Sequence, residues 1–166
     1  MSFQIINADI TKLRVDAIVN AANVELQKGG GVCGAIFKAA GAKNLENACK
    51  PLAPIQHGEA VITSGFKLSK YIIHAAGPIY KNGKQDEEKL LRSCYISSLE
   101  LALKYDCLSL AFPLISSGIF GYPKDEALKV ATCVIQDFLR NCNIDVFLAV
   151  FEKEDISGFI KRLFNK

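Results

Sequence analysis

The chain has 166 residues, enough for one domain with a substantial hydrophobic core. Half of the residues are hydrophobic and 22% are charged, which is typical of a globular protein and excludes a disordered or fibrous one. The formal net charge of +3 comes from scattered lysines and arginines, without the clustered basic face that duplex DNA binding normally uses.

The N-terminal sequence and the cysteines indicate a reduced, cytoplasmic protein. The first ten residues lack the basic and apolar regions of a signal peptide, and no run approaches the roughly 18 apolar residues of a membrane span. The six cysteines are widely separated and show none of the clustered spacings of a zinc site. We therefore expect no metal, no membrane association, and cysteines that mostly act as small buried apolar residues.

Short apolar runs alternate along the chain with longer segments of helical period. Six runs are predicted as strands: residues 3–7, 17–20, 59–64, 71–76, 108–114 and 145–150. Several are apolar on both faces, as expected for strands that are covered by helices on both sides. Helices are predicted from about Val32 to Ala40, from near Asp86, after Pro123 and after Asp155. The alternation predicts a layered α/β/α sandwich.

The first candidate site follows the predicted strand that ends at Asn20. A loop with Asn23 leads into glycines at positions 29–31, and a helix begins at about Val32. Consecutive glycines let the backbone approach a ligand closely, and the N–H groups at a helix start favour a bound anion. The segment matches neither the dinucleotide nor the ATP fingerprint. A phosphate-binding loop and an ordinary flexible turn both fit it.

The second candidate site is LISSGIFGYP at residues 114–123, again between an apolar strand and a helix. Its small residues would expose consecutive backbone amides to phosphate oxygens, and Phe120 would cover a ribose or a base. An ordinary strand-to-helix turn is the alternative. At strand ends of an open α/β sheet, the two loops would form one crevice that holds a diphosphate from both sides.

Three further residues fit around such a crevice. Asp9 follows the first strand, where its carboxylate would accept a hydrogen bond from an exocyclic amine and Ile10 would support an aromatic ring. A simple turn aspartate is the alternative. Phe151 follows the last strand and would stack on a base, or belong to the core. His74 lies inside an apolar strand, so we interpret it as a core histidine rather than an acid or base.

Together these segments resemble a macro domain. The resemblance covers nearly the whole chain and rests on motifs in the family's order: INADIT at 6–11, VDAIVNAAN at 15–23, GGGVCGAI at 29–36, HAAGP at 74–78 and FPLISSGIFGYP at 112–123. It implies a single macro domain over residues 1–166. The implied fold is a three-layer α/β/α sandwich with a mixed, mostly parallel six-stranded sheet, with a cleft for ADP-ribose and no cofactor.

The resemblance also implies roles for individual residues. Asp9 would bind the adenine amine with support from Ile10, and Phe151 would stack on the adenine. Asn20 and Asn23 would line the distal ribose, and Asn23 is the residue that the family ties to turnover. The diphosphate and distal ribose would be held by the two glycine loops, through Gly29, Gly30, Gly31, Val32, Cys33, Ser116, Ser117, Gly118, Ile119, Phe120 and Gly121.

Cys33 departs from many hydrolytic members, whose motif resembles GGGVDGAI. A carboxylate there would orient or deprotonate water, which a thiol does not do equivalently. Other hydrolytic members carry a non-acidic residue, and an oxygen of the ligand's own diphosphate is proposed to activate water. Cys33 is either a reactive thiol at a helix start or a small space-filling residue, the interpretation that we favour.

The implied activity is hydrolysis of an ester-linked ADP-ribose, on modified Asp or Glu side chains or on O-acetyl-ADP-ribose. Asn23 would position the distal ribose. The main alternative is a non-catalytic reader of ADP-ribose. ADP-ribose 1″-phosphate processing and RNA binding are less favoured alternatives. We expect a monomer whose partner is ADP-ribose or ADP-ribosylated protein, and no extended nucleic acid, because the positive charge is dispersed.

Overall fold

The strands in the part of the chain that the structure describes form one sheet. The computed structural model describes residues 2–151, 158, 160 and 161. Within them the strands are β1 (Ser2–Ile6), β2 (Ala17–Ala22), β3 (Ala60–Ser64), β4 (Tyr71–Ala76), β5 (Ser109–Pro113) and β6 (Asp145–Ala149). They lie in the order β1-β6-β5-β2-β4-β3, with β3 antiparallel to β4 and all other neighbours parallel. The predicted mixed, mostly parallel six-stranded sheet is confirmed.

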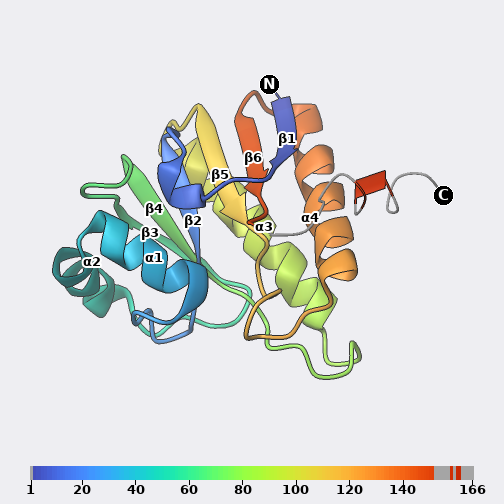
Figure 1. Ribbon diagram of the computed structural model, residues 1–166, viewed down its shortest axis with the longest axis horizontal. Coiled ribbons are helices and arrows are strands. Elements are labelled where there is room, and N and C mark those ends of the chain that lie inside the picture. The colour runs from blue at the N-terminus through green and yellow to red at the C-terminus, as the bar shows by residue number, and fades with distance from the viewer. Residues whose placement is uncertain (1, 152–157, 159, 162–166) are drawn as a thin grey trace.

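Helices cover both faces of this sheet. They are α1 (Gly31–Ala40), α2 (Ala42–Cys49), α3 (Glu87–Lys104) and α4 (Lys124–Phe138), with short 3-10 turns at Ile10–Lys12, Lys50–Leu52 and Leu139–Asn141. Figure 1 shows α1 and α2 on one side of the sheet and α3 and α4 on the other. In the part of the chain that the structure describes, no helix combines the length and the hydrophobicity that a membrane crossing needs.

Two hydrophobic cores lie between the layers, because successive residues of a strand point to opposite faces. Ala17 and Val19 of β2 pack into the core under α3 and α4, whereas Ile18 and Ala22 pack into the core under α1 and α2. The cysteines follow the prediction: all are free thiols, and most are buried, namely Cys33, Cys49, Cys94 and Cys107. Strands that are apolar on both faces are therefore explained by helices on both sides.

The carboxyl ends of the parallel strands meet at one level. Ile6 at the end of β1 pairs with Ala149 at the end of β6, and Ala149 pairs with Pro113 at the end of β5. The loops that leave these strands therefore start side by side. This edge is where open α/β sheets bind ligands.

The structure differs from the predicted elements at two places, and a third prediction falls largely on residues that the structure does not describe. Gly41 ends α1 as predicted, with a φ of 102°, but α2 begins at the next residue and was not predicted. The strand predicted to end at Asn20 continues to Ala22. The helix predicted after Asp155 falls largely on residues 152–157, 159 and 162–166, which lie outside the described residues.

Candidate functional site

A cavity of about 630 Å³ lies at this edge of the sheet. Loops that follow β1, β2, β4, β5 and β6 line it, through residues 8–10, 21–23, 29–33, 35, 77, 113–120 and 149–151. Both glycine loops, Asp9, Ile10 and Phe151 thus reach one cavity from distant parts of the sequence. Asn20 and Gly121 are the predicted site residues that do not line it.

The first loop is closed by the side chain of Asn23. The Nδ2 group of Asn23 donates a hydrogen bond to the backbone oxygen of Gln27 at 2.8 Å, and Oδ1 accepts one from the Gln27 backbone N–H at 3.1 Å. The Cys33 thiol donates to the same Gln27 oxygen at 3.8 Å. Leu26, with a left-handed φ of 54°, is buried beneath the loop. The amide of Asn23 therefore both borders the cavity and shapes the chain that leads into the glycines.

The glycines place the start of α1 against the cavity. Gly30 is the N-cap of α1, and no described side chain caps the helix there. The N–H groups of the first turn thus remain available to an anion. A Cβ on Gly34 would lie 2.6 Å from the backbone oxygen of Gly29, a distance that real Cβ atoms do not show. Glycine at position 34 is what allows the loop to lie this close to the helix.

The second loop is held by backbone hydrogen bonds. Tyr122 N–H donates to the Ser116 oxygen at 2.9 Å, and Tyr80 N–H donates to the Phe120 oxygen at 2.8 Å. Ser116 has a left-handed φ of 66°, and its buried hydroxyl has no hydrogen-bond partner among the described residues. An unfavourable backbone conformation of this kind concentrates at functional sites.

The two loops approach each other across the cavity. Ile119 at the tip of the second loop is 90% exposed. Its Cδ1 atom lies 3.8 Å from the place where a Cβ on Gly30 would be. The Ile119 side chain thus lies close to Gly30 and narrows the opening between the loops.

The other end of the cavity contains Asp9, Ile10 and Phe151. One oxygen of Asp9 accepts hydrogen bonds from the hydroxyl of Thr11 at 2.7 Å and from its backbone N–H at 2.9 Å. Both bonds lower the pKa of Asp9, and the bond from the Thr11 hydroxyl has the larger effect. Asp9 is therefore a carboxylate at neutral pH. Asp9 therefore caps the turn Ile10–Lys12 and also borders the cavity. Ile10 is buried, whereas Phe151 is 76% exposed.

The lining is almost free of charge. Among the described residues that line the cavity, Asp9 is the only one with a charged side chain. The end formed by Asn23, the glycines and Cys33 offers amide groups and a thiol that is only 6% exposed. No three His, Cys, Asp or Glu side chains of the described residues are grouped so that they could hold a metal ion.

Asn20 does not line the distal end of the cavity as predicted. Because β2 continues to Ala22, strand alternation turns Asn20 towards the core under α1 and α2, where it is buried. Its Nδ2 lies 3.1 Å from Nδ1 of His74, whose Nε2 lies 3.0 Å from the Thr63 hydroxyl. Burial lowers the pKa of His74 to about 4. The interpretation of His74 as a neutral core histidine is confirmed.

Gly121 also stands apart from the cavity. Its N–H donates to the Gly118 oxygen at 3.0 Å, which closes the turn at the tip of the second loop, and its φ is 74°. Gly77, in contrast, lines the cavity although it is not among the predicted site residues. A Cβ on Gly77 would collide with the Ser116 hydroxyl and lie 2.6 Å from Cγ2 of Ile115. A glycine directly after a buried strand, in HAAGP, was the available signal.

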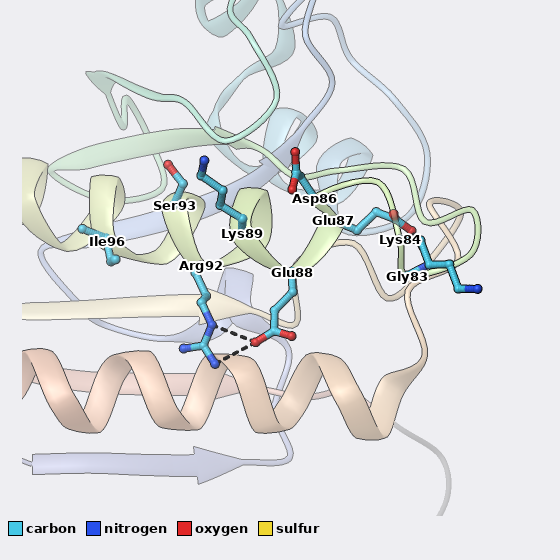
Figure 2. A pocket seen from close by; sticks show the side chains of 9 residues that line it. All are labelled: Gly83, Lys84, Asp86, Glu87, Glu88, Lys89, Arg92, Ser93 and Ile96. Atoms are coloured by element: carbon cyan, nitrogen blue, oxygen red, sulfur yellow. Dashed lines mark hydrogen bonds and ion pairs between the residues drawn. The ribbon is translucent and has the colours of Figure 1, made fainter.

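A second depression, of about 660 Å³, lies along the start of α3 (Figure 2). Three of its charged side chains, Glu87, Glu88 and Arg92, are held by one another or by the backbone. Glu88 pairs with Arg92 at 2.9 Å, as the dashed lines show. The carboxylate of Glu87 accepts backbone N–H bonds from Lys81, Asn82, Gly83 and Gln85. These charges organise the chain before α3, and we assign no ligand to this depression.

Glu87 is expected to make the stability of the fold depend on pH in acid solution. Burial opposes its ionisation, but the four N–H donors prevail and lower its pKa from 4.5 to about 2. A carboxylate with a lowered folded pKa stabilises the fold above 4.5 and loses this contribution as the pH falls towards 2. We expect Glu87→Gln to be less stable at neutral pH and to lose less stability over that pH range than the unmodified chain. Urea unfolding across the range measures this.

The matched control is Glu100→Gln, on the exposed side of the same helix. It should leave the pH profile of unfolding unchanged. If Glu87→Gln followed the same acid profile as the unmodified chain, the four-donor arrangement would not contribute to stability.

Comparisons with known proteins agree with the fold. The family model described as Macro domain matches residues 19–131. An O-acetyl-ADP-ribose deacetylase of Salmonella gallinarum is 44% identical, over 91% of this chain and 88% of that protein. An ADP-ribose glycohydrolase of Mus musculus is 45% identical, over 93% of this chain and 49% of that protein.

The chain is also similar to a solved structure. The Oceanobacillus iheyensis macrodomain with ADP superposes with a TM-score of 0.89 at 40% identity, covering 96% of this chain and 88% of that one. The matched family model, the sequence identities and the shared fold together show that the chain belongs to the macro domain family.

Proposed function

We propose that this chain binds ADP-ribose in the cavity and hydrolyses an ester bond at the distal ribose, on modified Asp or Glu side chains or on O-acetyl-ADP-ribose. One observation carries the proposal: the two glycine loops, Asp9, Ile10 and Phe151 border a single cavity at the carboxyl ends of the parallel strands. The names of the Salmonella and mouse relatives support this class of ligand and reaction.

The two ends of the cavity suit different parts of the ligand. The Asp9 carboxylate would accept a hydrogen bond from the adenine amine, while Ile10 and Phe151 would contact the ring. The first turn of α1 and the amides of residues 116–120 would hold the diphosphate, as backbone N–H groups and helix starts favour anions. The distal ribose would then lie beside Asn23, Gly29 and Cys33.

The near-absence of charge in the lining favours an ester as the bond that is broken. A carboxylate leaves without being protonated, because a carboxylic acid has a pKa of about 4. An alcohol or a guanidine is a far poorer leaving group and needs a general acid. Among the described residues, the distal end of the lining offers no carboxyl or imidazole group. We propose that an oxygen of the ligand's own diphosphate activates the water and that loop amides meet the developing negative charge.

A release assay with proteins of defined linkage tests the activity. We expect ADP-ribose to be released from Asp- or Glu-linked protein and from O-acetyl-ADP-ribose. Release from Ser- or Arg-linked protein should be slower by at least about 100-fold, because no acid assists the leaving group. Equal rates on all linkages would contradict the ester assignment.

The second candidate function is a reader that binds ADP-ribose without turnover. Cys33 favours it, because the thiol stands where many hydrolytic relatives place an acid and is nearly buried. In that case ADP-ribosylated protein would bind and no linkage would release product during a long incubation. The same assay therefore separates the two functions.

A further inference from the structure

Two side chains converge on one backbone carbonyl at the entrance of the first glycine loop. The Gln27 oxygen accepts the Asn23 amide at 2.8 Å and the Cys33 thiol at 3.8 Å. A Cβ on Gly29 would lie 3.7 Å from the sulfur and 3.8 Å from Nδ2 of Asn23. The thiol and the amide therefore lie next to each other behind Gly29.

Few other hydrogen bonds fix this part of the chain. The beginning of the segment 24–30 is held by Ile55 N–H, which donates to the Val24 oxygen at 2.9 Å, and by Leu26 N–H, which donates to the Asn23 oxygen at 3.1 Å. Residues 27–30 are exposed. Gln27 itself is held by the two hydrogen bonds of Asn23 and by the hydrogen bond of Cys33. The Gly30 oxygen accepts the Gly34 N–H at 3.3 Å, so it is the position of Gln27 that depends on the bonds of Asn23 and Cys33.

We propose that Cys33 is a positioning residue: its thiol donates to the Gln27 carbonyl beside the Asn23 amide and so holds segment 24–30 in the shape that presents Asn23 and the glycines to the distal ribose. The inference rests on the proposed function for its activity measurement, but its structural part concerns the ligand-free chain. It gives Cys33 a role in which the ability to donate a hydrogen bond matters and a negative charge does not.

An acid at position 33 would then be harmful in this chain. An ionised carboxylate has no proton to donate, so it would face the Gln27 oxygen as a second acceptor. Asp9 is the charged side chain of the lining and lies at the other end. Burial and the nearby Cys33 raise the pKa of Cys49 to about 11, and His74 has a pKa of about 4. When protonated, the introduced carboxyl would again have a proton to donate to the Gln27 oxygen.

Cys33→Asn and Cys33→Asp form the deciding pair, because they have the same shape and differ in the ability to donate. Cys33→Ala removes the donor, and Cys33→Ser replaces it with a hydroxyl. Cys133→Ser, at an exposed thiol of α4, controls for loss of a thiol elsewhere. Circular dichroism and the melting temperature of each variant establish that it is folded.

The first measurement is hydrogen exchange of the Gln27 N–H without ligand. We expect Cys33→Asp to accelerate this exchange by about tenfold at neutral pH, and Cys33→Asn and Cys33→Ser to stay within about threefold of the unmodified chain. Unchanged exchange in both Cys33→Asp and Cys33→Ala would overturn the proposal, whether or not the chain binds ADP-ribose. This outcome is independent of the proposed function.

The second measurement is ADP-ribose affinity and turnover as a function of pH. Positioning predicts an affinity about threefold weaker for Cys33→Ala and about tenfold weaker for Cys33→Asp at neutral pH, with recovery of Cys33→Asp in mildly acid solution as its carboxyl gains a proton. A general base at this position predicts the opposite sign: Cys33→Asp turnover above that of the unmodified chain and rising with pH. That result would overturn the proposal.

Discussion

Replacing Asn23 by alanine is expected to lower the turnover of ester-linked ADP-ribose by more than about 100-fold and to weaken ADP-ribose binding by less than about tenfold. The side chain contributes its amide at the distal end of the cavity, so its loss would misplace the reacting ribose while the adenine and diphosphate contacts remain. Single-turnover release measures the first effect and isothermal titration the second.

The structure adds a second consequence of the same change. The Asn23 amide makes two hydrogen bonds to Gln27, so Asn23→Ala should also accelerate exchange of the Gln27 N–H. Asn47→Ala, at an exposed position of α2, is the matched control and should change nothing. Unchanged turnover in Asn23→Ala would remove Asn23 from the proposed mechanism. A loss of affinity far beyond tenfold would indicate that Asn23 acts mainly by shaping the loop.

Gly34→Ala is expected to weaken ADP-ribose binding by more than about tenfold and to lower the melting temperature. Alanine normally stabilises a helix by up to about 1 kcal/mol relative to glycine, so the sign of the stability change is informative. Here the new Cβ would lie 2.6 Å from the Gly29 oxygen. Because that oxygen belongs to the backbone, the first glycine loop itself must move.

Lys38→Ala, on the exposed side of α1, is the comparison that changes helix propensity without touching the loop. It should bind ADP-ribose as the unmodified chain does. If Gly34→Ala bound equally well and melted at a higher temperature, the close approach of Gly29 to α1 would not matter for the site.

The layered fold was predictable because its signals are local. Strands apolar on both faces, such as β2 and β4, indicate helices on both sides, and Pro123 with two following acids marks the start of α4. The start of α2 was not predicted, because Gly41 is a normal helix end and a helix that resumes at the next residue leaves no loop signal. Gly41 serves as C-cap of one helix and N-cap of the next.

The candidate site was only partly predictable. The glycine loops can be recognised in the sequence by their composition. Their positions after predicted strands indicate that they lie together. Whether Asn20 lies in the sheet or in the loop beside the cavity depends on where β2 ends. The predicted end at Asn20 is two residues short of the observed end at Ala22, so the prediction placed the Asn20 side chain in the cavity rather than in the core. The contact of Gly77 with Ser116 and Ile115 joins distant segments, and no local pattern encodes it.

Isothermal titration of the unmodified chain with ADP-ribose tests the central claim most directly. The account predicts saturable binding at one site, with weak dependence on salt, because uncharged backbone amides rather than lysines or arginines hold the diphosphate. An absence of binding would contradict the assignment of the two glycine loops to a diphosphate, and with it the proposed function.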